Sequence, residues 1–285
     1  MSVDKFLLLE PGVALVVAEN TCQSPTGIRR SIALLKAFRL EQSDPAAFYQ
    51  IQAEDTMMQI ERDLSFEGAC VLDVGGGPGF FSKAMQERGA SVVLVEPGAG
   101  EQPPEKFSDP HAALTEDEAH RKGTWPGKMV PNHTVAGDGY VLPFASETFD
   151  VVFSSNVLEH VADPERFIKE SIRVTKPGGI VYISYTVWLS PNGGHETSPW
   201  HFIGGHFARR RFEKKNGKSP KNVFGESMFA CYVRPVLKIV ERLPTVEVVR
   251  AEPRHYPSWM RWVVKVPLLN EVLTQNLALT LRVTA

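Results

Sequence analysis

The chain has 285 residues, of which 43% are hydrophobic and 22% charged, and its formal net charge is −2. These values fit one large globular α/β domain with insertions, or one domain with a small cap. With so small a net charge, the protein as a whole does not attract nucleic acid or acidic lipid electrostatically, so any such attraction must come from a local patch of positive charge.

The cysteines and the apolar runs indicate the cellular compartment of the protein. Cys22, Cys70 and Cys231 are widely spaced and form no CxxC pair, so neither a zinc site nor a disulfide framework is expected. The apolar run 6–9 is followed by Glu10-Pro11, which argues against a signal peptide. No stretch reaches the roughly 18 apolar residues of a membrane span. We expect a cytoplasmic protein of unknown oligomeric state.

The first 65 residues predict an irregular start and then an N-terminal helical extension, residues 1–65. Asp44-Pro45 is a helix-start signal, because an N-cap acceptor precedes a proline at the first helical position. The helix that it opens is expected to run toward Leu64.

Residues 66–285 predict one domain in which strands and helices alternate. Short apolar runs alternating with helical segments favour a doubly wound α/β fold with a mostly parallel sheet covered on both faces. Strands are expected at 69–74, 91–95, 149–154, 180–185, 246–250 and 277–283. Two stretches interrupt the alternation: an insertion at 99–134, rich in Pro, Gly and charge, and a cap at 187–242.

The end of the first strand carries a glycine-rich turn, Gly75-x-Gly77-x-Gly79. Ligands bind beyond the carboxyl ends of parallel strands, and glycines let the backbone approach them closely. The turn does not match the dinucleotide fingerprint G-x-G-x-x-G. Asp73, two residues before the glycines, disfavours a pyrophosphate and suits a cationic ligand. Glu96 ends the second strand at a spacing that suits a carboxylate gripping ribose hydroxyls.

Five sequence blocks, in one order, resemble the class I S-adenosylmethionine-dependent methyltransferases, in their small-molecule, type 11-like branch. The blocks are residues 71–79, 93–97, 137–144, 149–161 and 176–179. The resemblance implies a seven-stranded Rossmann-like methyltransferase fold with a cap insertion, and S-adenosylmethionine as cofactor. It also implies cofactor-binding roles for Asp73, Gly75, Gly76, Gly77, Gly79, Glu96, Pro97, Asp138, Gly139 and Asn156.

Within that resemblance, the glycines line the methionine end of the cofactor and Asp73 helps to fix the cofactor's amino group. Glu96 binds the ribose, while Asp138 holds the adenine edge. Two other functions stay open on sequence alone: a nicotinamide-dependent Rossmann oxidoreductase, and a non-catalytic S-adenosylmethionine-binding regulator. Each residue also has a structural interpretation as a tight turn or a cap.

His160 is the candidate general base, because it follows the strand expected at 149–154 and histidine is the residue type that commonly accepts protons near neutral pH. A structural or cofactor-supporting role for His160 is the alternative. His195, Glu196, His201 and His206 are too loosely spaced to predict a metal site, so none is expected.

The cap is expected to hold the acceptor, with Trp200 and His201 as candidate substrate contacts. No Asn-Pro-Pro-aromatic motif follows the strand expected at 149–154. Its absence favours a small-molecule, sugar or lipid acceptor over nucleic acid, and we expect methylation at an oxygen of that acceptor. The basic run 209–218 is interpreted as a solvated helix face or an anion contact. Trp259 and Trp262 are expected to pack in the core, with peripheral membrane contact as the alternative.

Overall fold

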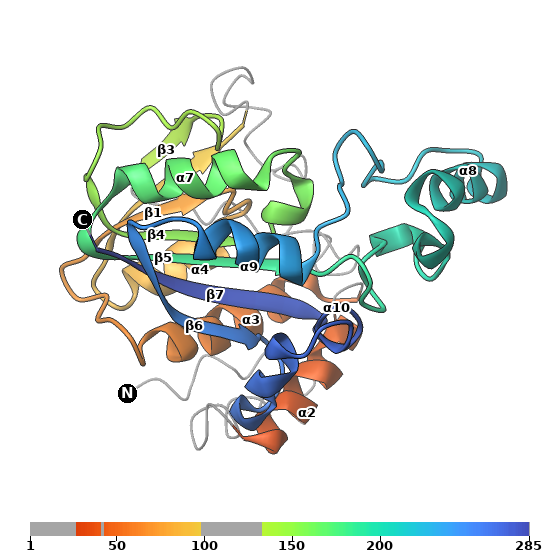
Figure 1. The fold of residues 1–285 in the computed structure, drawn as a ribbon, viewed down its shortest axis with the longest axis horizontal. Coiled ribbons are helices and arrows are strands. Elements are labelled where there is room, and N and C mark those ends of the chain that lie inside the picture. The colour runs from red at the N-terminus through yellow and green to blue at the C-terminus, as the bar shows by residue number, and fades with distance from the viewer. Residues whose placement is uncertain (1–26, 41–42, 98–132, 285) are drawn as a thin grey trace. The chain divides into compact units, whose positions relative to one another are not determined.

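The computed structural model describes residues 27–40, 43–97 and 133–284 (Figure 1). The predicted irregular start and nearly all of the predicted 99–134 insertion lie outside these residues. Seven strands follow the order β3-β2-β1-β4-β5-β7-β6 in a mixed sheet, which confirms the predicted fold class. The chain divides into two compact units: unit 1 runs to Asp138 and includes His255–Ser258, and unit 2 holds Gly139–Arg254 and the residues from Trp259 on.

Unit 1 combines the N-terminal helices with three parallel strands. Its elements are α2 (Ile28–Ala37), η1 (Phe38–Leu40), α3 (Pro45–Ile60), β1 (Cys70–Val74), α4 (Phe80–Gln86), β2 (Ser91–Glu96) and β3 (His133–Ala136). Strand β2 pairs in parallel with both β1 and β3. Because β3 begins at His133, the last two residues of the predicted insertion belong to the sheet, where they pair with β2.

Helix α3 begins as its sequence predicts. The Asp44 side chain accepts a hydrogen bond from the Ala47 N–H (3.1 Å), and Pro45 occupies the first turn, where no N–H is needed. The helix ends at Ile60 rather than at Leu64. Such an N-cap contributes about 1 kcal/mol to helix stability.

A buried ion pair joins α2 to α3 inside unit 1. The Arg30 guanidinium donates two hydrogen bonds to the Asp55 carboxylate, each 2.6 Å long, and both side chains are 1% exposed. Arg30 also donates to the Tyr256 carbonyl (3.3 Å). Removing one partner of such a pair costs about 3–5 kcal/mol, because a charge is then left buried. This pair therefore fixes α2 on α3.

Unit 2 holds the remaining four strands. Its elements are β4 (Phe149–Ser155), η2 (Leu158–His160), α7 (Pro164–Val174), β5 (Thr175–Thr186), η3 (His195–Thr197), η4 (Trp200–Ile203), α8 (Gly205–Asn216), α9 (Val233–Glu241), β6 (Val246–Pro253), η5 (Ser258–Lys265), α10 (Leu269–Leu273) and β7 (Asn276–Val283). Strands β4 and β5 are parallel, while β7 is antiparallel to both β5 and β6.

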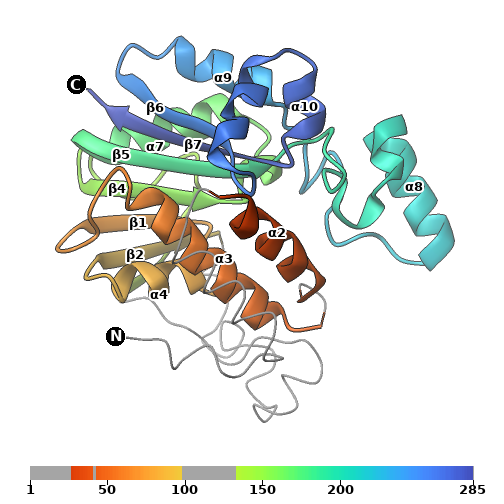
Figure 2. The same ribbon diagram turned by 90° about the horizontal axis from the view of Figure 1, so that it is seen from below.

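The helices of unit 2 divide into two groups. Helix α7 contacts β4 and β5, and α9 contacts β6 and α7, so both lie on the sheet (Figure 1). Helix α8 instead packs on η3 and η4, in the segment that follows β5 (Figure 2). The predicted cap, 187–242, thus contains one helix, α9, that packs on the sheet, because the buried Val233, Val236 and Val240 give it an apolar face.

Candidate functional site

The glycine-rich turn lies directly after β1, beside the end of β2. Val74 pairs with Val95 in the parallel register, and the Gly75 N–H donates to the Val95 carbonyl (2.8 Å). Gly77 has a φ of +54°, which favours glycine, and no atom of the described residues lies within 4 Å of where its Cβ would stand. Among the described residues, the turn therefore presents bare backbone to an open space at the carboxyl edge of unit 1.

Gly76 is needed for a different reason. A Cβ at this position would stand 2.3 Å from Asp73 Oδ2 and 2.5 Å from Leu94 Cδ1. The missing side chain lets the turn fold directly over the Asp73 carboxylate.

Asp73 is the most perturbed titratable group of unit 1. Its side chain is fully buried, and the Ser82 hydroxyl donates a 2.6 Å hydrogen bond to Oδ2. Its Oδ1 is also buried and has no hydrogen-bond partner within the residues that the structure describes. Burial raises the pKa of Asp73 to about 7; the Ser82 bond opposes this rise, and the nearby Glu96 charge adds to it. Ser82 was not predicted from sequence, although its place in the first turn of α4 puts it next to the glycine turn.

Glu96 ends β2 and reaches the glycine turn. One of its carboxylate oxygens accepts a hydrogen bond from the Gly77 N–H. Burial raises the pKa of Glu96, and the Gly77 bond acts against that rise. The main chain continues this edge, because the Gly137 N–H donates to the Glu96 carbonyl (3.2 Å), which brings Asp138 next to it. Pro97 and Asp138 are both exposed.

These features fit the cofactor that the sequence resemblance implies. A buried carboxylate with an unpartnered oxygen suits a cationic ligand, since a cation would compensate for the lost hydration. The open space over Gly77 admits the ligand, and Glu96 supplies a hydrogen-bond acceptor for hydroxyl groups beside it. A dinucleotide pyrophosphate would instead meet two carboxylates.

Asn156 occupies the corresponding place in unit 2, directly after β4. It has a φ of +57°, its N–H donates to the Ser184 carbonyl (2.8 Å), and its Oδ1 accepts from Asn276 Nδ2 (2.7 Å). The side chain is exposed. The structure fixes its conformation, and its contact with the methionine part of the cofactor stays a prediction, as does that of Gly139.

His160 lies in η2, four residues after Asn156, and one of its ring nitrogens is engaged. Nδ1–H donates to the Ser227 carbonyl (2.6 Å), which leaves Nε2 as the nitrogen available to accept a proton. The partner is 67 residues away in sequence, so no local pattern could have predicted it. The His195 ring lies 5.5 Å from the His160 ring, centroid to centroid. Burial lowers the pKa of His195.

The two predicted substrate contacts of the cap differ from each other. Trp200 is 39% exposed, and the Arg211 guanidinium lies 3.8 Å from its ring centroid. His201 is 1% exposed, its Nε2–H donates to the Ser190 carbonyl (3.1 Å), and its Nδ1 accepts from the Ser198 hydroxyl (3.2 Å). With both ring nitrogens engaged, His201 fits the role of a structural link within the cap.

The prediction that Trp259 and Trp262 pack in the core is wrong. Their exposed fractions are 64% and 48%, while Val263 and Val264 of the same 3-10 helix are buried. The segment forms a 3-10 helix, and its geometry turns the two valines inward instead. The tryptophans thus belong to the surface of unit 2.

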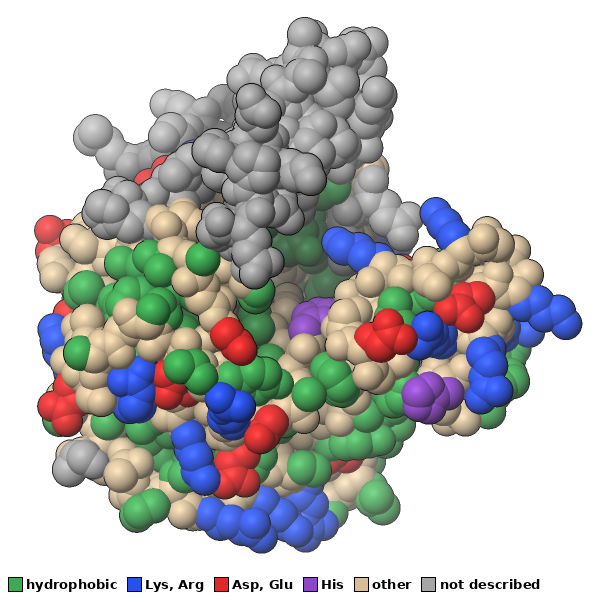
Figure 3. All heavy atoms as spheres, turned by 90° about the horizontal axis from the view of Figure 1, so that it is seen from above, with side chains coloured by type: hydrophobic (Ala, Val, Ile, Leu, Met, Phe, Trp, Pro, Cys, Tyr) green, Lys and Arg blue, Asp and Glu red, His purple; other side chains and the backbone are tan. Residues whose placement is uncertain are grey.

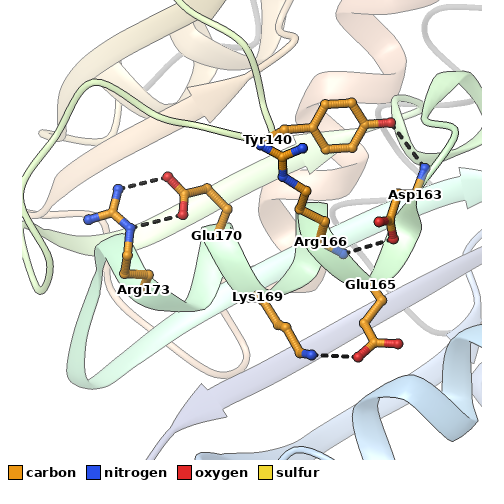
Figure 4. Close-up of a pocket in the computed structure, with 7 residues that line it drawn as sticks. All are labelled: Tyr140, Asp163, Glu165, Arg166, Lys169, Glu170 and Arg173. Atoms are coloured by element: carbon orange, nitrogen blue, oxygen red, sulfur yellow. Dashed lines mark hydrogen bonds and ion pairs between the residues drawn. The ribbon is translucent and has the colours of Figure 1, made fainter.

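An open pocket of about 490 Å³ lies along α7 (Figure 4). Its charged groups are largely paired with one another: Arg173 donates to Glu170 (2.7 Å), and Lys169 donates to Glu165 (2.5 Å). The pocket is lined by Tyr140, Asp163, Glu165, Arg166, Lys169, Glu170 and Arg173. Because these partners lie on one helix, the arrangement is that of a solvated helix surface. Among the described residues, no helix is long and apolar enough to cross a membrane.

Comparisons with known proteins agree with this geometry. The family model of the methyltransferase domain matches residues 72–183, which include the glycine turn, Glu96 and His160. An uncharacterized methyltransferase of Mycobacteroides abscessus is 41% identical over 262 residues, covering 90% of this chain and 94% of its own length. One from Mycobacterium tuberculosis is also 41% identical over 262 residues, with 89% and 94% covered.

Among solved structures, an S-adenosylmethionine-dependent methyltransferase from Mesorhizobium loti has a TM-score of 0.49 and 19% identity, with 81% of this chain and 97% of that one covered. These relatives at 41% identity match 90% and 89% of the chain. The chain belongs to the methyltransferase family of these relatives.

Proposed function

We propose that this methyltransferase transfers a methyl group to a hydroxyl oxygen of an amphipathic, acidic lipid. The observation that carries the proposal is a cap patch in which exposed apolar side chains adjoin a row of cations. Its apolar members are Trp200, Phe202, Ile203 and Phe207, which are 39%, 49%, 67% and 45% exposed.

The cations of the cap patch come from helix α8. They are Arg210, Arg211, Lys214 and Lys215, and Lys218 follows the helix. Arg209 of the same helix is paired with Glu213 and Glu226. Figure 3 shows Lys and Arg side chains over this part of the molecule, with acidic side chains among them. The patch thus pairs apolar surface with positive charge, which suits an acyl chain next to an acidic group. A free neutral sugar has neither an acyl chain for the apolar surface nor an acidic group for the cations.

The cofactor-binding turn of unit 1 also supports the proposal. When bound, S-adenosylmethionine supplies a methyl group on a cationic sulfur, which an acceptor oxygen can displace. We infer that Asp73 faces the cationic end of the cofactor and that Glu96 holds its ribose. Such positioning supplies roughly 7–11 kcal/mol of a barrier when reactants are well oriented. The acceptor proton needs a destination, and His160 Nε2 is the side-chain atom that we propose for it.

A second exposed surface favours a lipid acceptor independently. The C-terminal patch comprises Trp259, Trp262, Leu268, Leu269, Val272 and Leu273, which are between 41% and 82% exposed. Arg261 and Lys265 lie in the same segment. Aromatic and apolar side chains interleaved with cations are typical of a surface that rests on an anionic membrane. Peripheral contact there would place the enzyme where its acceptor resides.

The test is a series of hydroxy acids that differ only in acyl-chain length, with an amine-bearing analogue of each. We expect KM for the hydroxy acids to fall with chain length, by up to about fourfold per methylene that the patch buries. Trp200→Ala should weaken this dependence, whereas His206→Asn, at an exposed position of the neighbouring helix α8, should keep it. A KM independent of chain length, or faster turnover of the amines, would refute the proposal.

A further inference from the structure

Three side chains of unit 2 bring potential metal ligands together. Glu159, His160 and His195 each offer one ligand atom, and these atoms all lie within 4.8 Å of one another. Glu159 and His160 belong to η2, at the carboxyl end of β4, and His195 begins η3, in the segment after β5. The parallel pairing of β4 with β5 is what brings these two segments to one edge.

Glu159 supplies a buried carboxylate with one oxygen in use. The side chain is 2% exposed, and the Thr186 N–H donates to Oε1 (3.1 Å). Its other oxygen, Oε2, is buried without a hydrogen-bond partner in the described part of the chain. Buried charged oxygens are ordinarily hydrogen-bonded or coordinated to a metal. An unsatisfied carboxylate oxygen beside two imidazoles therefore points to a cation.

Each of the two histidines keeps one ring nitrogen for a ligand. The Nδ1–H of His160 is held by the Ser227 carbonyl, which is the arrangement that metal-binding histidines use to orient the other nitrogen toward the ion. His195 Nε2 is buried and, within the described residues, has no partner. The neighbouring Glu196 points elsewhere, since its carboxylate accepts from Asn222 Nδ2 (3.0 Å).

We propose that Glu159, His160 and His195 form a binding site for a divalent transition-metal ion of the zinc type. Two imidazole nitrogens and one carboxylate suit Zn²⁺ and its first-row neighbours, whereas Mg²⁺ and Ca²⁺ prefer oxygen ligands alone. Ligand atoms around a tetrahedral Zn²⁺ stand roughly 3.4 Å apart, so small rotamer adjustments close the observed cluster. Three protein ligands leave a coordination position open.

The role of the ion rests on the proposed function, whereas its binding does not. At the open position, the ion would polarise the acceptor's hydroxyl, and the hydroxyl proton would then leave to solvent water. With the ion bound, His160 Nε2 would be a ligand, so solvent would replace it as the proton acceptor proposed above for the metal-free site. Neither His201 nor His206 belongs to this cluster, and the loose spacing of the cap histidines did not predict it.

Calorimetric titration of the full chain with Zn²⁺ alone tests the site. The wild type should bind one equivalent, and Glu159→Gln and His195→Asn should each lower its affinity at least tenfold. Glu159→Gln keeps an oxygen for the Thr186 N–H, and asparagine tolerates the φ of +47° at position 195. His206→Asn, on the exposed surface of α8, should bind as the wild type does.

The same samples give a second readout, because bound Zn²⁺ should raise the Tm of the wild type and of His206→Asn but not of the two site variants. Should Glu159→Gln fail to fold, His195→Asn decides alone. Absence of one-equivalent binding, or wild-type affinity in a folded site variant, would overturn the site. Because no acceptor is present, that result leaves the proposed acceptor class standing.

Discussion

Proton release on cofactor binding is the sharpest consequence of the Asp73 environment. In the free chain the pKa of Asp73 is about 7, because its carboxylate is buried. A cationic cofactor beside it would favour the ionised form, so binding must expel the proton that the free chain carries. At pH 6 a group with this pKa is about 90% protonated, and binding should release about 0.9 proton. At pH 7.5 the release should fall to about 0.2 proton.

The affinity must follow the same linkage. The free state binds the proton more tightly than the bound state, so affinity rises with pH until the free carboxylate is itself ionised. From pH 6 to pH 7.5 the gain is about eightfold. Calorimetry in buffers of different ionisation enthalpy measures both quantities. Ser82→Ala removes a bond that lowers this pKa, so it should move the midpoint to higher pH. A pH-independent affinity without proton release would refute our assignment of Asp73.

The raised pKa of Asp73 also predicts that the ionised carboxylate destabilises the cofactor-free chain while it favours cofactor binding. A raised acid pKa means that stability is lost as pH rises from the unfolded value toward 7. The change from 3.8 to about 7 corresponds to roughly 4 kcal/mol at most. Asp73→Asn should therefore stabilise the cofactor-free chain at pH 8, measured by denaturant unfolding, while it weakens cofactor binding and abolishes the proton release.

Three further perturbations test other parts of the account. Glu96→Ala should weaken cofactor affinity about 10- to 150-fold, since a charged hydrogen bond contributes roughly 1.5–3 kcal/mol, and unchanged calorimetric affinity would remove Glu96 from the ribose. Gly76→Ala should lower both Tm and cofactor affinity, because its Cβ would stand 2.3 Å from Asp73 Oδ2; a wild-type melting curve would contradict that close approach. Replacing Trp259 and Trp262 with alanine should reduce cosedimentation with anionic vesicles at least tenfold and leave cofactor affinity unchanged, and equal sedimentation of variant and wild type would exclude the C-terminal patch from membrane contact.

Local chemistry explains what the sequence could predict. Apolar runs of strand length marked six of the described strands, and Asp44-Pro45 marked a helix start whose cap the structure shows. Strand β3 escaped prediction, because its four residues adjoin a Pro- and Gly-rich stretch and gain their order from pairing with β2. Short strands depend on such tertiary contacts more than on intrinsic propensity.

In the candidate site, too, residues close together in the sequence could be predicted, whereas contacts between distant segments could not. Asp73, the glycines and Glu96 lie within 24 residues of one another, so one strand-turn-helix-strand pattern located them together. The partnership of His160 with Ser227, and the approach of His195 to Glu159, join segments far apart in the chain. No spacing rule reports such contacts. His201 was predicted to meet substrate because it lies in the predicted cap, but its burial and its two engaged nitrogens depend on the local turn around Ser190 and Ser198.

The acceptor class is the central claim, and methyl transfer into fractionated extracts tests it most directly. The enzyme is incubated with methyl-labelled S-adenosylmethionine and either a total lipid extract or the matched aqueous extract of the same cells. We predict that label accumulates in an acidic lipid as a methyl group on oxygen, identified by mass spectrometry and NMR, and that Trp200→Ala reduces the yield at least tenfold. Label confined to water-soluble products, or a methyl group on nitrogen or carbon, would contradict the proposed function.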